Sequence, residues 1–220
     1  KDIHKNGVSL IGGMLYNRIA DENSEFNLGE VFLKGDHNAE NVVTAFAITY
    51  CDLKQEKLLG AIQQTQIIAA IRKFKGLKHR MEFLGSIDNI NFINDSKATN
   101  AESTENALKF YNNVFWILGG KSKEDGILSL APYFNKITKA FLIGEASEDF
   151  AQILTENSVE FEKCETLANA IEKSFFEAKK HSLKESNILL SPACASFDQW
   201  KNFEERGNFF CKAFNELKNS

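Results

Sequence analysis

From residue 81 onward, short apolar runs alternate with longer stretches whose apolar positions recur at helical spacing. The runs with the composition of strands are 81–86, 90–93, 114–118, 140–143 and 187–190, with a weaker one at 159–161. The stretches with helical spacing are 101–111, 127–134, 147–157, 167–181 and 198–217. This succession of strand and helix predicts an α/β fold, a mostly parallel sheet with helices on both faces.

The first part of the chain has a different pattern. The short apolar runs that predict a small antiparallel ribbon lie at 8–11, 14–19 and 30–33. One helix is predicted to open at His37-Asn38 and a second to cover 57–74, and Gly76 ends the second as glycine commonly ends helices. We therefore predict two domains, 1–76 and 77–220.

Composition narrows the class of protein. Of 220 residues, 43% are hydrophobic and 25% charged, which is typical of a soluble globular chain. A net charge of −4 with a pI near 5.7 gives no signature of nucleic-acid binding, and no basic cluster suits a membrane surface. No uncharged apolar run approaches the about 18 residues of a membrane span. The four cysteines lack a C-x-x-C spacing, so we expect reduced thiols in a cytoplasmic protein.

Polar residues that could carry chemistry follow three of the predicted strands. They are the runs 94–100 (N-D-S-K-A-T-N), 119–123 (G-G-K-S-K) and 191–197 (S-P-A-C-A-S-F). Because the carboxyl ends of parallel strands meet at one edge of a sheet, we expect the three loops to line a single cleft. Asn100 is a good N-cap, and a helix N-terminus beside Lys97 favours an anion such as a phosphate or a carboxylate.

Each of these loops also has a purely structural explanation. A capped, solvated turn would account for 94–100, and a solvated lysine loop for 119–123. Gly120-Lys121-Ser122 is not part of a P-loop, because G-x-x-x-x-G-K-[ST] needs a glycine where Phe115 stands. No acid–base group in the sequence supports Cys194 as a nucleophile, so we expect a packed structural thiol there.

For histidines and amides outside these loops, the sequence allows both a functional and a structural interpretation. His79-Arg80 at the domain boundary could contact a ligand or form a linker salt bridge. His37-Asn38 with Asn41 opens a helix, where amides either bind a base edge or cap the helix. His4 and His181 have no partners at metal-ligand spacing, so we expect surface residues. The aromatic residues at helical spacing that we expect in the core are Phe209, Phe210 and Phe214.

Taken in order, several motifs resemble those of the Mur ligase family. The segments that carry the resemblance are 35–38 with Asn41, 77–80, 92–100, 118–120, 190–196 and 201–207. The runs N-D-S-K-A-T-N and S-P-A-C-A-S are the most specific. The first is similar to the sequence that family members adding D-glutamate carry at the matching loop. Sibling ligases carry a D-Y-A-H-x-P or Y-N-A-N-P type of sequence at that loop. The resemblance covers essentially the whole chain.

The resemblance implies a domain organisation. The family has a UDP-sugar domain, a central ATPase domain and a C-terminal Rossmann-like domain that binds the incoming amino acid. Residues 1–76 would be the C-terminal part of the ATP-binding domain, and 77–220 the Rossmann-like domain. The P-loop and the Mg²⁺ ligands would precede Lys1, which agrees with a sequence that begins without an initiator Met or a signal peptide. We therefore expect a fragment with no metal site and no catalysis of its own.

The resemblance also implies a reaction, ATP-dependent amide formation. In it, ATP phosphorylates the alanyl carboxylate of UDP-N-acetylmuramoyl-L-alanine, and the amine of D-glutamate attacks the acyl phosphate. Catalysis would rest on positioning and on neutralising charge with lysines and Mg²⁺. The partners would be these three small molecules, in a monomeric cytoplasmic enzyme of peptidoglycan precursor synthesis, with no nucleic acid and no membrane.

By match to the family's motifs, individual residues receive roles. The residues expected to be catalytic are Lys97, Asp95 and His79. The residues expected to bind the nucleotide are Asn38, Asn41, Arg80, Asp95 and Lys97, the last three when the C-terminal domain closes. The residues expected to hold D-glutamate are Thr99, Lys123, Ser196, Phe197 and Phe203.

The sequence departs from the family pattern at two points. The family's glycine pair is usually followed by x-x-Lys, which selects Lys123 over Lys121, but Gly126 stands where an acid is common. Phe197 replaces a smaller apolar residue. Two alternatives remain. The sequence at 95–100 argues against a sibling Mur or folylpolyglutamate-type ligase, and the incomplete first part argues against a stand-alone amino-acid- or nucleotide-binding module.

Overall fold

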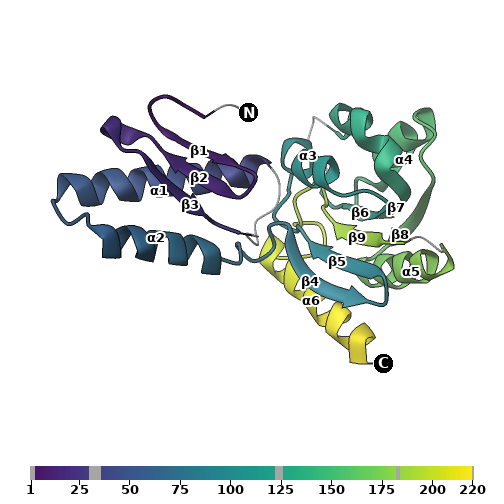
Figure 1. Ribbon diagram of the computed structural model, residues 1–220. Helices are drawn as coiled ribbons and strands as arrows, with labels where there is room; N and C mark the ends of the chain where they lie inside the picture. The colour runs from purple at the N-terminus through teal and green to yellow at the C-terminus, as the bar shows by residue number, and fades with distance from the viewer. Residues whose placement is uncertain (1–2, 30–35, 122–125, 182–183, 220) are drawn as a thin grey trace. The chain divides into compact units, whose positions relative to one another are not determined.

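The chain forms two compact units, Lys1–Gly76 and Leu77–Ser220. The computed structural model describes residues 3–29, 36–121, 126–181 and 184–219 (Figure 1). The family roles expected for the two units stay predictions, because a division into compact units does not test what each unit binds.

The first unit contains an antiparallel sheet of three strands in the order β1-β2-β3. These strands are β1 (Val8–Ile11), β2 (Met14–Asn17) and β3 (Ser24–Asn27), with the short 3₁₀ helix η1 (Ile19–Asp21) between the last two. The predicted ribbon is confirmed, but its third strand was missed. β3 contributes one large apolar side chain, Phe26 opposite Leu15, which is too little for a sequence signal. The strand predicted at 30–33 lies entirely outside the described residues.

Two helices, α1 (Asp36–Gln55) and α2 (Ala61–Lys73), complete this unit. The second helix begins four residues later than predicted, because Lys57 has a φ of +55° and Gly60 is the N-cap. The core of the unit consists of Val8, Leu15, Leu28, Val42, Phe46, Tyr50 and Ile68.

The second unit is built on a six-stranded sheet with the order β4-β5-β9-β6-β7-β8. β4 and β5 form an antiparallel hairpin, and the other neighbouring pairs are parallel. The strands are β4 (Glu82–Ile87), β5 (Ile90–Asn94), β6 (Val114–Gly119), β7 (Ile137–Ile143), β8 (Phe161–Glu165) and β9 (Ser186–Leu190). The sheet confirms the predicted α/β class, although β7 begins earlier and β8 later than predicted.

Both faces of this sheet are buried, which explains why its strands are continuous apolar runs. Side chains alternate along β6, so that Trp116 and Leu118 join one core while Phe115 and Ile117 join the other. The first core is covered by α3 (Ala101–Phe110), η2 (Leu128–Lys136) and α4 (Ser147–Glu156). The second is covered by α5 (Leu167–Lys180) and α6 (Phe203–Asn219) (Figure 1). Phe210 and Phe214 are buried in it, as predicted.

Local chemistry corrects three predicted helices. The segment after Ile127 is a 3₁₀ helix and contains Pro132. Ser147, which the sequence suggests as the N-cap of the helix at 147–157, is instead its first helical residue. The N-cap is Ala146, and the hydroxyl of Ser147 donates to the carbonyl of Gly144. α6 begins at Phe203 instead of residue 198, because Asn202 Oδ1 accepts a hydrogen bond from the N–H of Glu205 in the N-cap pattern.

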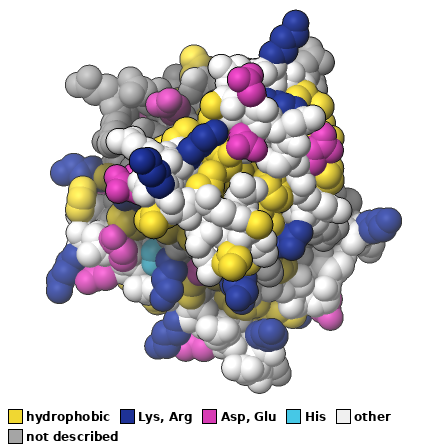
Figure 2. Space-filling model, turned by 60° about the vertical axis from the view of Figure 1, so that its left-hand side comes forward, with side chains coloured by type: hydrophobic (Ala, Val, Ile, Leu, Met, Phe, Trp, Pro, Cys, Tyr) yellow, Lys and Arg dark blue, Asp and Glu magenta, His cyan; other side chains and the backbone are white. Residues whose placement is uncertain are grey.

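The surface carries charges of both signs. On the face shown in Figure 2, basic and acidic side chains are interspersed. No helix in the described part of the chain is both long and apolar enough to cross a bilayer. None of the four cysteines forms a disulfide in the described part of the chain, and Cys194 is buried as expected for a packed thiol.

Candidate functional site

The three polar loops lie side by side at one edge of the second unit's sheet. β5, β9 and β6 are parallel neighbours, so the loops that follow Asn94, Leu190 and Gly119 emerge together. Backbone hydrogen bonds join them. The N–H of Asp95 donates to Leu190 O at 2.7 Å, and the N–H of Gly119 donates to Pro192 O at 2.9 Å. The predicted convergence of the loops is confirmed, while the cleft that they are expected to line stays a prediction.

The glycine pair after β6 is required by close backbone contacts. Gly119 and Gly120 have φ values of +118° and +130°, and a Cβ on them would lie 2.0 Å from Ile143 O and 2.3 Å from Ala195 O. Lys121 follows with an exposed side chain, and its N–H donates to Ala195 O at 2.9 Å. The glycines therefore bring this loop against the loop after β9. Lys123, predicted to hold a carboxylate of D-glutamate, lies outside the described residues.

Asp95 is a buried carboxyl group that joins three segments. Its Oδ2 accepts a hydrogen bond from Ser191 Oγ at 2.8 Å, and its Oδ1 accepts one from the N–H of Met81 at 3.0 Å. Burial raises the pKa of Asp95 to about 7, although these hydrogen bonds and the charge of Arg80 act in the opposite direction. The carboxyl fixes the turn that presents Arg80, in which His79 and Met81 both have positive φ.

The loop after Asp95 carries one buried and one exposed group. Ser96 is buried, and its Oγ donates to the carbonyl of Phe203 at 2.8 Å. Lys97 is exposed, and its Nζ lies 3.9 Å from the centre of the Phe203 ring, a cation–π contact. Asn100 caps α3 as predicted, with its Oδ1 accepting from the N–H of Ser103 at 2.9 Å. Thr99, between them, is half-buried.

Arg206 is the site residue that the sequence analysis missed. It is 1% exposed, and its guanidinium donates from Nε to Ser96 Oγ, and from Nη2 to Ser96 O and to Cys194 O, at 2.9 to 3.1 Å. Its Nη1 has no hydrogen-bond partner among the described residues. Burial lowers its pKa to about 10. The signal was present, because an arginine one residue before Gly207 and four before Phe210 lies on the apolar face of α6.

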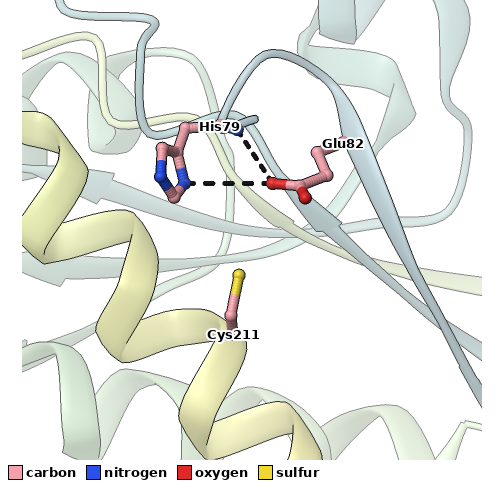
Figure 3. Close-up of side chains that lie close together, drawn as sticks. All are labelled: His79, Glu82 and Cys211. Carbon is pink, nitrogen blue, oxygen red and sulfur yellow. Dashed lines mark hydrogen bonds and ion pairs between the residues drawn. The ribbon is translucent and has the colours of Figure 1, made fainter. Parts of the chain in front are cut away.

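His79 and Arg80 are adjacent in the chain but differ in their exposure to solvent. His79 is 4% exposed, and its Nδ1 lies 3.9 Å from Glu82 Oε2 (Figure 3). The same nitrogen lies 2.9 Å from Asn94 Nδ2. Its carbonyl accepts a hydrogen bond from the N–H of Lys97 at 2.9 Å. Arg80 is exposed. His79 is thus packed inside the second unit, where it holds the turn, while Arg80 and Lys97 present cations on two bonded segments.

The remaining predicted residues have different surroundings. Ser196 is buried beside the hydrogen-bonded loops, whereas Phe197 is 68% exposed. Asn38 and Asn41 belong to the first unit, where Asn41 Nδ2 lies 3.5 Å from Asn38 Oδ1. Asn41 also borders a largely apolar groove of about 620 Å³ between α1 and α2. His4 and His181 are exposed, as predicted.

Comparisons with known proteins relate the chain to one family of ligases. Residues 79–194 match the family model described as Mur ligase, glutamate ligase domain. The UDP-N-acetylmuramoylalanine–D-glutamate ligase of Wolbachia pipientis wMel is 49% identical over 197 residues, which cover 90% of this chain and 37% of that protein. The enzyme of the same name from Rickettsia bellii is 39% identical over 215 residues, covering 98% and 46%. The chain thus spans less than half the length of these relatives.

Solved structures of two further ligases share the fold. UDP-N-acetylmuramate-alanine ligase MurC from Thermotoga maritima aligns with a TM-score of 0.60, at 14% identity, over 96% of this chain and 45% of that one. MurF from Acinetobacter baumannii aligns with a TM-score of 0.61, at 14% identity, over 93% and 44%.

Proposed function

The chain belongs to the Mur ligase family, and on that premise we propose that it is the part of a UDP-N-acetylmuramoylalanine–D-glutamate ligase that binds D-glutamate and one side of ATP. The family is ATP-dependent. The proposed reaction takes place in the cytoplasm and forms an amide between the alanyl carboxylate of the UDP-sugar and the amine of D-glutamate. Cysteines without disulfides in the described part of the chain are consistent with such a compartment.

The observation that carries the proposal is the convergence of the three loops around the N-terminus of α3. Arg80 and Lys97 offer exposed cations there, and Lys121 offers a third from the neighbouring loop. D-glutamate, an acyl phosphate and ATP are all anions, so a site with several cations and a helix N-terminus fits them. Asp95 and Arg206 are buried beneath these cations, and they hold the loops that carry the cations in place.

The first unit contributes to the proposal through its exposed apolar surface. Ile48 on α1 and Ile62 on α2 are 65% and 71% exposed, and the groove between the two helices is lined mostly by apolar side chains. A folded protein rarely leaves so much apolar surface uncovered. We propose that the groove is covered by further polypeptide of a larger ATP-binding domain. Asn38 and Asn41 at the start of α1 would contact the adenine side of the nucleotide that this ATP-binding domain holds.

In the proposed mechanism, ATP supplies the phosphoryl group that activates the alanyl carboxylate, and Mg²⁺ is held outside this chain. Lys97 and Arg80 bind phosphate oxygens and offset the charge that gathers in the transition state. Thr99, Ser196 and a lysine of the loop after β6 orient D-glutamate by its carboxylates. Asp95 and His79 are positioning residues, because both are buried and bonded to the turn or loop that carries these cations.

The proposal is tested in the complete ligase by following phosphate release. Release should require ATP, UDP-N-acetylmuramoyl-L-alanine and D-glutamate, and L-glutamate should not replace D-glutamate. Lys97→Ala should lower kcat by on the order of 100-fold or more, a loss typical of a group that stabilises transition-state charge. Lys109→Ala, an exposed lysine on α3 that pairs with Glu105, is the matched control and should change kcat little. Release that is indifferent to D-glutamate would refute the proposal.

Titration of the 220-residue chain with D-glutamate, with L-glutamate as the control, asks a narrower question. Stereoselective shifts of the backbone amides around Thr99, Lys121 and Ser196 would show that this chain selects the amino acid by itself. Equal effects of both enantiomers at these amides would argue against a D-glutamate pocket made by these loops.

A further inference from the structure

The carboxamide of Asn94, at the end of β5, stands at the meeting point of three structural elements. Its Nδ2 lies 2.9 Å from His79 Nδ1 in the turn before β4, and 3.4 Å from Glu82 Oε2 at the start of β4. It lies 3.1 Å from both Gly207 O and Cys211 Sγ on α6. Asn94 itself is completely buried. Four groups with lone pairs therefore surround one amide nitrogen.

The orientation of the amide follows from its other side. Asn94 Oδ1 accepts a hydrogen bond from the N–H of Ser96 at 3.2 Å, so the nitrogen must face the four acceptors. An amide NH₂ has two protons, and the acceptors therefore share them. Glu82 Oε2 also accepts the N–H of His79 at 2.8 Å, and it is the most distant of the four groups from the amide nitrogen. The contacts to His79, Gly207 and Cys211 are shorter.

The same acceptors form a donor set that metal ions use. Ligand atoms of His79, Glu82 and Cys211 lie within 4.8 Å of one another (Figure 3). A zinc ion would need about 2.0 to 2.3 Å to each of them. The amide nitrogen is within 3.4 Å of all three groups, so an ion at their centre would overlap it. The amide thus takes the position of a cation in a pocket of electron-rich atoms.

We propose that Asn94 is a positioning residue for ligation, whose carboxamide fixes the 79–82 turn and α6 to the loop that carries Lys97 and, as a consequence, keeps metal ions out of the pocket. This inference rests on the proposed function for its effect on catalysis, but its effect on metal binding does not.

Asn94 is connected to Lys97 through two separate series of contacts. On one side, the Asn94 amide holds His79, whose carbonyl accepts the N–H of Lys97. On the other side, it holds Gly207 in the first turns of α6, where Phe203 carries the ring beneath the Lys97 ammonium. A shift of either element moves the cation, and misplacement of about 1 Å at a reacting group can cost about 100-fold in rate.

The first experiment uses Asn94→Asp in the complete ligase, because the substitution keeps the shape and removes both donors. We expect kcat to fall by about 10- to 100-fold, because acceptors then face one another around His79 and Gly207. The matched control is Asn91→Asp in the same strand, whose amide donates to Asn187 and Glu185 at the far end of β5. It should leave kcat within about threefold. Wild-type kcat in Asn94→Asp would overturn the proposal.

The second experiment measures metal binding by the 220-residue chain. Asn94→Ala vacates the centre of the pocket, so this variant should bind about one equivalent of Co²⁺ with a thiolate-to-cobalt absorption band, and Zn²⁺ should displace the cobalt. The wild type and the double variant Asn94→Ala/Cys211→Ser should show no such band. A band in the wild type, or none in a folded Asn94→Ala variant, would contradict the cation-like role of the amide.

The two experiments fail in different ways. If the unmodified complete ligase shows no D-glutamate-dependent turnover, the proposed function is wrong, while the cobalt test still decides the role of the amide. If the unmodified ligase is active and Asn94→Asp matches it, the positioning role is wrong and the proposed function stands. Should Asn94→Ala not fold, Asn94→Asp in the complete ligase decides alone, because the variant keeps the size of the side chain.

Discussion

Gly207 on α6 allows the sharpest test of how the second unit is assembled. A Cβ built on this residue would lie 2.2 Å from His79 Nδ1, 2.8 Å from its Cγ and 2.9 Å from its Cε1. Non-bonded heavy atoms pack at about 3.5 to 4.0 Å, so Gly207→Ala must drive the ring and the helix apart by more than about 1 Å. His79 is 4% exposed, so its neighbours must also move if the ring is displaced.

Three terms decide the size of the effect on the free energy of unfolding. Overpacking of this kind costs about 1 to 3 kcal/mol. Displacement of the ring also weakens the 2.9 Å contact between His79 Nδ1 and Asn94 Nδ2, which adds about 1 kcal/mol. Replacing glycine by alanine inside a helix returns about 1 kcal/mol of backbone propensity. We therefore expect Gly207→Ala to destabilise the second unit by about 1 to 3 kcal/mol.

Urea unfolding followed by tryptophan fluorescence measures this quantity. Trp116 and Trp200 are the two tryptophans of the chain, and both lie in the second unit, so the signal reports that unit. Asn208→Ala is the matched control, since it changes an exposed neighbour in the same helix and should be neutral or slightly stabilising.

A double-mutant cycle isolates the contact. In a His79→Ala background the ring is absent, and Gly207→Ala should then stabilise the unit by up to about 1 kcal/mol. If Gly207→Ala is as stable as the wild type in the presence of His79, the packing of the ring on the helix is not as described.

Two further substitutions test the loops. Asp95→Asn should flatten the pH dependence of stability. Because the folded pKa of Asp95 is raised from 3.8 to about 7, its contribution is fully present below about pH 4 and is lost as the pH rises to about 7, on the order of 4 kcal/mol at most. Urea midpoints of variant and wild type at about pH 5 and about pH 8 check this, and parallel curves would contradict it. Gly120→Ala should destabilise by roughly 1 to 3 kcal/mol, because its Cβ would lie 2.3 Å from Ala195 O at a φ of +130°; an unchanged melting temperature would show that the loop relaxes freely.

Much of the second unit could be predicted from local pattern. The runs that became β5, β6, β7 and β9 are apolar because both faces of the sheet are covered, and that property is visible in the sequence without knowing what covers them. Asn100 is likewise local, since an N-cap needs only its own helix. The strand β3 escaped prediction because only Phe26 marks it, and its partner is in another segment.

The candidate site was predicted in part. The loops after the strands were found because polar residues at strand ends stand out against the apolar runs. The roles of Lys97 and Phe203 came from resemblance, and their contact at 3.9 Å joins residues that are far apart in the chain. Lys123 and the nucleotide contacts of Asn38 and Asn41 stay predictions, because Lys123 lies outside the described residues and the contact between Asn38 and Asn41 does not show what either binds.

What the sequence by itself determined is the set of elements, their polarity, and which loops could carry chemistry, because these depend on neighbours within a few residues. Only the tertiary structure decided the strand order, with the last strand, β9, inserted between β5 and β6. That order is set by non-local pairing and packing, which no short window contains. The tertiary structure also decided that His79, Asn94 and Arg206 are buried. A buried polar side chain is tolerated only where distant segments supply its partners, so its burial is a property of the fold and not of the residue.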